Sequence, residues 1–206
     1  MRELNQYQKL IKHFTDGCDV TEFEAAEEGK YPYVILPIES RMTSEYLDAV
    51  IREMIRMLDS ELGVATCLVI PEAKAFLLGT MIGKDSGLPV VTLKKNRDYR
   101  LPGQVTINTI GKAYKGGEYD VFYTTGLREG DRPLLVDDMI SSGWTPISMV
   151  KGLALHDYNL VGIGSLYERG AGIEIIKDKT GYDAKGLARL EIIDGKPVVT
   201  RFWDSK

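Results

Sequence analysis

The hydrophobic and polar positions after residue 43 alternate between two repeating patterns. In 44–63 apolar side chains recur every three or four residues, which indicates an amphipathic helix, and Gly63 is a stop signal. Short, almost wholly apolar runs then alternate with helical patterns. The apolar runs are 65–70, 88–93, 133–138 and 160–168, and the helical patterns are 72–87 and 145–156. Apolar strands that alternate with helices are typical of parallel sheets. The pattern therefore predicts an α/β fold, with a mainly parallel, doubly wound sheet covered by helices on both faces.

The two ends of the chain and one long internal stretch differ from this pattern. A short helix is expected at 3–14, followed by an extended segment at 31–38 that prolines interrupt. Near the other end, two apolar runs flank Asp194-Gly195, which predicts a β-hairpin. The polar stretch 94–118 has a poor apolar pattern and several Gly and Lys residues, so no regular element is predicted there.

Composition narrows the class of protein. The 206 residues fit one domain, and the net charge of −4 argues against nucleic acid as the main partner, because phosphate-binding surfaces are usually basic. The two cysteines, Cys18 and Cys67, are too far apart in the sequence for a CxxC motif, and we expect both to be reduced thiols. No signal sequence or long apolar run is present, so a cytoplasmic protein without membrane contact is expected.

The stretch LLVDDMISSGWT, residues 134–145, carries the most specific chemistry. Its apolar run predicts a buried strand that ends at Asp137 and Asp138, and ligands of doubly wound sheets bind beyond the carboxyl ends of the strands. The residues that follow are small and hydroxylated and lead into a helix, whose first N–H groups can bind an anion. Carboxylates accept hydrogen bonds from hydroxyls. A ribose phosphate would satisfy both halves of this arrangement.

The aspartate pair allows three other interpretations. The pair could be a helix cap with a solvated charge beside it. It could be the metal-binding carboxylate of a nucleoside triphosphatase, but the chain has no GxxxxGK[ST] motif. It could be the acidic pocket of a receiver domain, but too few residues follow Asp138 to complete one.

The stretch PLLVDDMISSGWT resembles the phosphoribosyl-diphosphate signature of type I phosphoribosyltransferases. The resemblance implies that Asp137 and Asp138 are catalytic. It also implies that the ribose 5-phosphate is bound by both aspartates and by the loop Ser141, Ser142, Gly143, Trp144 and Thr145. The usual loop reads Thr-Gly-Gly-Thr or close to it, so the tryptophan is a departure. We expect its side chain to pack outward; the alternative is that it reshapes the site.

Two further stretches extend the resemblance to the adenine phosphoribosyltransferase branch of this family. VIPEAKAFLLG, residues 69–79, is similar to its diphosphate loop, and LKKNRDYRLPG, residues 93–103, to the basic segment after the next strand. The resemblance implies that the diphosphate is bound by Glu72, Ala73, Lys74, Lys94 and Lys95. Tyr114 matches a catalytic tyrosine of that branch, but Ala113 stands in place of the glutamate before it, which puts adenine in doubt.

Residues 119–199 look closest to the archaeal hypoxanthine/guanine phosphoribosyltransferase-like subgroup of this branch. The resemblance, which covers roughly 30–200, implies an N-terminal extension with hood elements at 1–40 and a phosphoribosyl-diphosphate-binding core at 41–170, whose mobile lid is 94–118. A C-terminal helix and hairpin would occupy 171–206. It implies transfer of ribose phosphate from phosphoribosyl diphosphate to a purine, hypoxanthine or guanine rather than adenine, with Mg²⁺ held through substrate and water, in a homodimer.

Two other functions stay open from the sequence. The departure at Trp144 and the missing glutamate would also suit a regulator that senses phosphoribosyl diphosphate without catalysis. Such proteins usually carry a DNA-binding module, and the acidic first thirty residues are too short and of the wrong sign for one. A transferase that uses a different base, such as a pyrimidine, is the third possibility.

Overall fold

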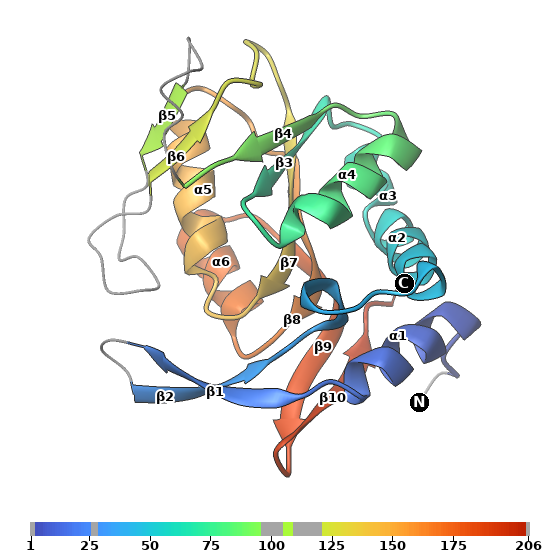
Figure 1. Ribbon diagram of the computed structural model, residues 1–206. Coiled ribbons are helices and arrows are strands. Elements are labelled where there is room, and N and C mark those ends of the chain that lie inside the picture. Colours follow the sequence, from blue (N-terminus) through green and yellow to red (C-terminus); the bar gives the residue numbers. More distant parts are fainter. Residues whose placement is uncertain (1–2, 26–28, 96–104, 109–120, 205–206) are drawn as a thin grey trace.

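The computed structural model describes residues 3–25, 29–95, 105–108 and 121–204. A six-stranded sheet lies at its centre (Figure 1), with the strand order β10-β9-β8-β7-β3-β4. Its strands are β3 (Cys67–Pro71), β4 (Val90–Leu93), β7 (Pro133–Ile140), β8 (Gly162–Glu168), β9 (Ala184–Ile193) and β10 (Lys196–Phe202). All neighbours are parallel except β9 and β10. The predicted α/β fold with a mainly parallel sheet is therefore confirmed.

The central strands are largely apolar because both of their faces are covered. In β7, Leu134 and Val136 pack against one hydrophobic cluster, while Leu135 between them packs against the other. The first cluster contains the buried sides of α2 (Ser44–Met57) and α4 (Ala75–Ser86). The second contains those of α5 (Trp144–Ala154) and α6 (Gly172–Thr180). Figure 1 shows these helix pairs on opposite sides of the sheet.

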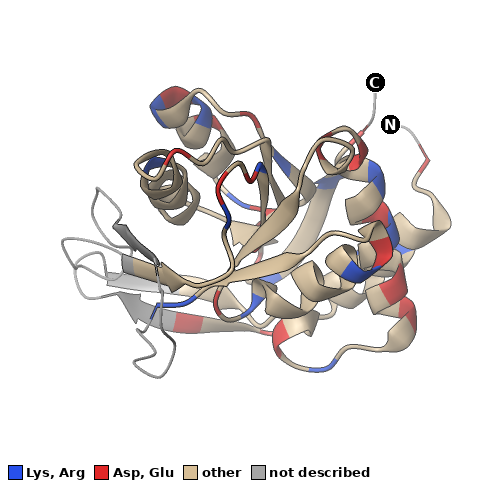
Figure 2. Cartoon of the chain, turned by 90° about the horizontal axis from the view of Figure 1, so that it is seen from above, with Lys and Arg blue, Asp and Glu red and all other residues tan. Residues whose placement is uncertain are grey.

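Helix ends follow local sequence signals. Thr43 caps α2 by accepting a hydrogen bond from the Tyr46 N–H at 3.3 Å, and α3 (Asp59–Leu62) follows directly. Gly87 ends α4 with a φ of 72°, a left-handed conformation that glycine adopts without a Cβ penalty. In Figure 2 the charged residues lie mainly on the helices and loops, and few lie on the central strands. Among the described residues, none of the helices has the length and hydrophobicity needed to span a bilayer.

The N-terminal segment packs against the C-terminal hairpin. It comprises α1 (Gln6–Asp16), a two-stranded sheet of β1 (Val20–Ala25) and β2 (Gly29–Val34), and the short 3-10 helix η1 (Pro37–Glu39). Asp16 accepts a hydrogen bond from the Val199 N–H of β10 at 2.9 Å, and the ammonium of Lys12 donates to the Val199 carbonyl. Buried hydroxyls of Thr15, Tyr46 and Tyr167 also bond to one another and join α1, α2 and β8.

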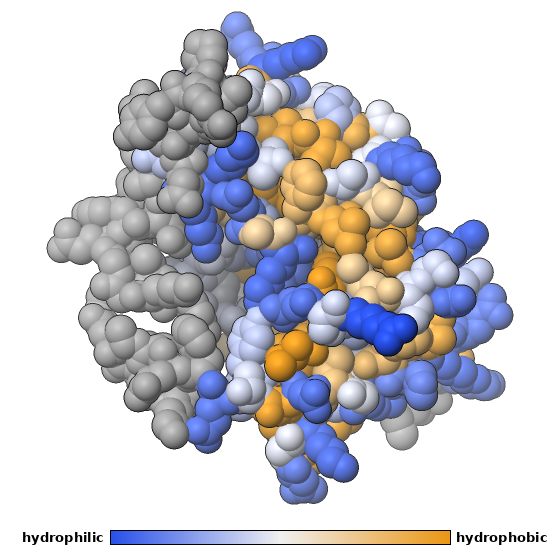
Figure 3. Space-filling model, viewed as in Figure 1, coloured by the Kyte–Doolittle hydropathy of each residue, from blue (hydrophilic) through white to orange (hydrophobic). Residues whose placement is uncertain are grey.

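Several elements differ from the sequence predictions. The hairpin at Asp194-Gly195 forms as expected, with φ values of 51° and 74°, but its first strand β9 also joins the main sheet in parallel with β8. Strand β1 was not predicted. In the polar stretch 94–118, β5 (Val105–Asn108) pairs with β6 (Val121–Thr124), and most of the expected lid lies outside the described residues. The hydropathy surface in Figure 3 shows apolar side chains over α4, where Phe76 and Leu77 are exposed.

Candidate active site

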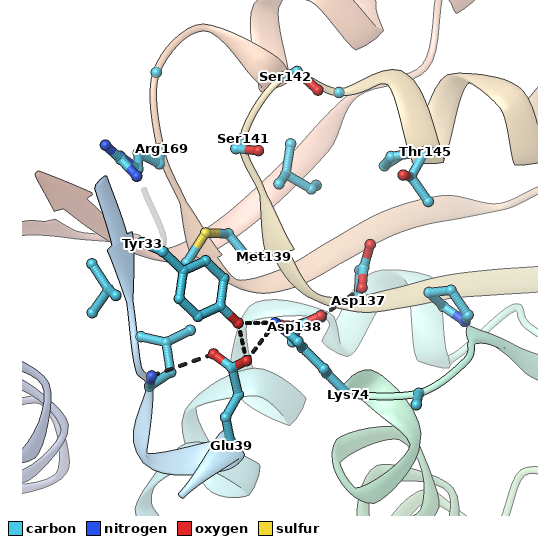
Figure 4. Close-up of a pocket in the computed structure, with 18 of the residues that line it drawn as sticks. Tyr33, Glu39, Lys74, Asp137, Asp138, Met139, Ser141, Ser142, Thr145 and Arg169 are labelled. Atoms are coloured by element: carbon cyan, nitrogen blue, oxygen red, sulfur yellow. Dashed lines mark hydrogen bonds and ion pairs between the residues drawn. The ribbon is translucent and has the colours of Figure 1, made fainter. Parts of the chain in front are cut away.

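A cavity of about 620 Å³ opens at the carboxyl ends of β3, β7 and β8. Segments that are far apart in the sequence line it, namely the end of β2 and η1, the loop before α4, Lys95, the end of β7 with the loop before α5, and the loop after β8. Figure 4 shows Tyr33, Glu39 and Lys74 pointing toward one another, with Asp137 and Asp138 beside them. The parallel topology explains this arrangement, since each β-strand delivers its following loop to the same edge of the sheet.

Asp137 and Asp138 line this cavity at the end of β7. Asp137 is only 7% exposed, and one of its oxygens accepts the backbone N–H of Asp138 at 2.8 Å. Burial, reinforced by the charge of Asp138, raises the pKa of Asp137 well above the usual aspartate range. Burial also raises the pKa of Asp138, against the opposing effects of its hydrogen bond to Asp137 and of the Lys74 charge. The pair therefore holds a proton more readily than exposed aspartates do, and hydrogen-bond donors from a ligand would favour its ionised form.

The loop 141–145 joins β7 to α5 and lines the cavity with two serine hydroxyls and a threonine hydroxyl. Gly143 precedes the first turn of α5 with a φ of 78°. A Cβ at this position would lie 2.6 Å from the carbonyl oxygen of Gly172 and 3.1 Å from Ile176, so the start of α6 packs directly against the loop. The loop thus presents hydroxyls and the amino end of a helix to the cavity, an arrangement that suits an anion.

Trp144 is the first residue of α5 and is 37% exposed. Of the described loop residues, it is the one that does not line the cavity, whereas Ser141, Ser142, Gly143 and Thr145 do. The helical geometry explains the difference, because successive side chains of a helix point about 100° apart. Trp144 therefore lies outside the cavity lining to which the resemblance assigned it, and its packing against a neighbour stays a prediction.

The loop after β3 places Glu72, Ala73 and Lys74 along the cavity, and the peptide bond between Glu72 and Ala73 is cis. The Glu72 N–H donates to the Leu93 carbonyl at 2.9 Å, and the Glu72 carboxylate accepts the N–H of Lys95 at 3.2 Å. These bonds join the ends of β3 and β4, so Lys95 also lines the cavity.

Two described residues that the sequence assigned to the site, Lys94 and Trp144, are not found in the cavity lining. Among the described residues, Lys94 lies outside the lining, because its backbone pairs with that of Tyr123 in β6. Its proposed role toward diphosphate is thus not supported by its position. Tyr114, the proposed catalytic tyrosine, lies outside the described residues.

Three side chains in the cavity were missed by sequence reasoning. Tyr33 at the end of β2 and Glu39 of η1 contact Lys74, whose ammonium donates to the Tyr33 hydroxyl and forms an ion pair with Glu39 (Figure 4). Arg169, after β8, donates from Nη1 to the carbonyl of Pro32 at 2.9 Å. No spacing in the sequence marks these residues, because tertiary contacts between distant segments bring them to the cavity.

The cavity lining suits an elongated anion with hydroxyls at its centre. The described lining contains the carboxylates of Glu39, Glu72, Asp137 and Asp138, against the cations of Lys74, Lys95 and Arg169. Within the described part of the chain, no group of three or more His, Cys, Asp or Glu side chains is arranged to hold a metal ion. Carboxylate oxygens do suit Mg²⁺, so the aspartate pair can assist a cation whose other ligands come from substrate and water.

Comparisons with known proteins connect this site to a family. No protein-family model matches the chain. The chain is 33% identical over 193 residues to the hypoxanthine/guanine phosphoribosyltransferase of Methanothermococcus okinawensis, covering 92% of this chain and 98% of the relative. It is 32% identical over 193 residues to the enzyme of the same name from Methanocaldococcus jannaschii, covering 92% and 99%.

Solved structures show the same fold at lower identity. The adenine phosphoribosyltransferase of Leishmania donovani superposes with a TM-score of 0.70 at 17% identity, covering 90% of this chain and 82% of that one. That of Trypanosoma brucei, in complex with AMP, pyrophosphate and ribose-5-phosphate, gives a TM-score of 0.69 at 18% identity, covering 90% and 81%. The curated relatives match at higher identity over nearly the whole chain. Together with the shared fold, they show that the chain belongs to the type I phosphoribosyltransferase family and is a purine phosphoribosyltransferase, an enzyme of purine salvage.

Proposed function

We propose that this enzyme transfers the 5-phosphoribosyl group of phosphoribosyl diphosphate to hypoxanthine or guanine and releases diphosphate. The observation that carries the proposal is the position of Asp137 and Asp138, which lie between the hydroxylated loop 141–145 and Lys74 (Figure 4) in a cavity that Lys95 also lines. This order matches the substrate, whose 5-phosphate, ribose hydroxyls and diphosphate follow one another. The curated relatives are named hypoxanthine/guanine phosphoribosyltransferases, which favours these bases.

In the proposed reaction, a purine ring nitrogen forms a bond to C1′ of the ribose while the bond from C1′ to the diphosphate oxygen breaks. The electron pair of the broken bond leaves with diphosphate, and the proton of the ring nitrogen passes to solvent or a basic group. Positive charge builds on the ribose in the transition state. Asp137 and Asp138 would accept hydrogen bonds from the ribose hydroxyls and stabilise that charge, so catalysis rests on positioning and electrostatics.

The charges of the described lining support the proposal that Mg²⁺ takes part. Four carboxyl groups face three cations there, so a polyanionic substrate would meet no excess of positive charge even with one proton on the aspartate pair. A divalent cation bound with the substrate would offset the negative charge of the substrate and the charge that develops on the leaving diphosphate. We propose that the carboxylate oxygens of Asp137 and Asp138 would help to hold this Mg²⁺ ion.

The base would lie on the side of the N-terminal segment, where Tyr33, Val34 and Leu36 line the cavity. Arg169 supports the preference for hypoxanthine and guanine. A guanidinium carries five N–H donors, of which Arg169 uses one on Pro32. Donors suit the 6-oxo acceptor of hypoxanthine and guanine, and they do not suit the 6-amino donor of adenine.

The test incubates the enzyme with phosphoribosyl diphosphate, Mg²⁺ and hypoxanthine, guanine, adenine, xanthine or uracil in separate reactions. Nucleotide and diphosphate are both measured. We expect the hypoxanthine and guanine reactions to have the highest kcat/KM and the Arg169→Met variant to lose part of this preference over adenine. Turnover of adenine or uracil alone would overturn the assignment of the base, and release of diphosphate with none of the bases would overturn the proposed reaction.

A further inference from the structure

Tyr33, Glu39 and Lys74 form a hydrogen-bonded cluster inside the cavity (Figure 4). The Tyr33 hydroxyl donates to Glu39 and accepts from the Lys74 ammonium, which also forms an ion pair with the same carboxylate. The three residues come from β2, η1 and the loop before α4, so only the tertiary structure brings them together. Lys74 belongs to the stretch that we propose binds diphosphate, whereas no local pattern assigns a role to Tyr33 or Glu39.

Glu39 is the fixed partner in this cluster and Lys74 is the movable one. The Glu39 side chain is 13% exposed, and its second oxygen accepts the N–H of Leu36 at 3.3 Å, which holds the carboxylate against its own turn. The Lys74 side chain is 45% exposed, and its four-carbon stem can reorient. A ligand that competes for the ammonium would therefore draw Lys74 away from Glu39, while the carboxylate stays in the cavity wall.

The cluster also sets the charge at this end of the cavity. Glu39 offsets the positive charge of Lys74, and its own charge is close enough to Asp138 to raise the pKa of that residue. An incoming diphosphate would meet a lysine that is already paired with the Glu39 carboxylate. After binding, the diphosphate would remain close to that carboxylate, which repels it. Both effects weaken the attraction between the enzyme and the diphosphate.

We infer that Glu39 is a positioning residue that limits the affinity of this enzyme for diphosphate by pairing with Lys74. This inference rests on the proposed function, because it takes diphosphate as the leaving group that Lys74 contacts. The consequence for catalysis is easier release of product, since Glu39 takes Lys74 back as diphosphate departs. Tyr33 keeps the two charged groups aligned by bonding to both.

The experiment measures the binding of inorganic diphosphate, with Mg²⁺, to the wild type and to Glu39→Gln by titration calorimetry. Glutamine keeps the size of the side chain and one acceptor oxygen for Lys74, but it removes the charge. We expect the variant to bind diphosphate about tenfold more tightly, equivalent to about 1.4 kcal/mol, and the difference to shrink when the salt concentration is raised. Product inhibition by diphosphate should strengthen in parallel, and KM for phosphoribosyl diphosphate should fall.

Two controls distinguish a local effect on Lys74 from a general effect of removing one negative charge. Glu129→Gln makes the same change of charge in the exposed turn before β7, away from the cavity, and should leave diphosphate affinity unchanged. Ribose 5-phosphate, which we propose binds at loop 141–145, should bind Glu39→Gln and the wild type equally well. Glu39→Ser removes the charge in a second way and serves if the glutamine variant does not fold.

The possible outcomes bear on different claims. If the wild type binds neither diphosphate nor ribose 5-phosphate, the proposed function fails. If the wild type binds both, and the neutral variants bind diphosphate no more tightly than the wild type, the inference about Glu39 is wrong while the proposed function stands. Tighter binding of both ligands by the variants would also overturn it, because the gain would then come from a general change of the cavity.

Discussion

Gly143 is the position in the candidate site where a single methyl group should have the largest effect. Its φ of 78° is left-handed, and a Cβ there would lie 2.6 Å from the Gly172 carbonyl oxygen. The contact is close from both sides, because a Cβ on Gly172 would in turn lie 2.3 Å from the Ser141 carbonyl oxygen of the same loop. Substitution of Gly143 by alanine should therefore force loop 141–145 and the start of α6 apart.

The magnitude of this effect has two parts. A left-handed conformation costs an alanine about 1–2 kcal/mol. The overlap with Gly172 should add about 1–3 kcal/mol, the usual cost of overpacking a closely packed contact. Gly130 offers a matched control, because its φ is 81° and a Cβ there would have no described atom within 4 Å. Gly130→Ala should therefore lose only the first part, and the difference between the variants isolates the second.

The assay measures the free energy of unfolding of both variants in urea, together with their affinity for ribose 5-phosphate. We expect Gly143→Ala to be the less stable of the two by about 1–3 kcal/mol. We also expect its kcat/KM to fall by about a hundredfold, because small displacements of a binding loop have effects of that size. If Gly143→Ala matched Gly130→Ala in both stability and ligand affinity, the proposed role of the loop and its packing against α6 would be refuted.

Three further predictions concern the aspartate pair and the buried hydroxyls. Asp138→Asn should lower kcat/KM by about a hundredfold with the fold retained by circular dichroism, since each lost contact to a developing charge costs about 3 kcal/mol; unchanged kinetics would contradict the role of the pair. Burial raises the pKa of Asp137 in the folded state, so its protonation stabilises the fold at low pH. This contribution to folding stability is lost as pH rises through the folded-state pKa. Asp137→Asn should accordingly gain stability relative to the wild type as pH rises above the usual aspartate pKa, and a pH-independent difference in urea unfolding would argue against this. Tyr167→Phe removes a hydroxyl that bonds to both Thr15 and Tyr46, so urea unfolding should show a loss of about 1–3 kcal/mol, and an unchanged midpoint would show that the bonds contribute little.

Local sequence signals determined the elements whose formation depends on neighbouring residues. The apolar runs at β3, β7 and β8 could be read as buried strands because a strand covered on both faces needs apolar side chains throughout. The turn at Asp194-Gly195 could be predicted because its left-handed backbone favours these residue types. The aspartates at the end of β7 and the loop before α5 are contiguous in the chain, so this half of the site was visible without a structure.

Tertiary structure alone decided which distant segments meet. Residues of β1 and β5 carry no strong local pattern, and each strand forms by pairing with a partner strand. Glu39 lies in a short turn with nothing in its surroundings to mark it as part of a site, yet the packing of the N-terminal segment places its carboxylate on Lys74. The sequence determined the chemistry at the end of β7 because those residues are neighbours along the chain. The opposite wall of the cavity depends on contacts across the fold, which no local pattern encodes.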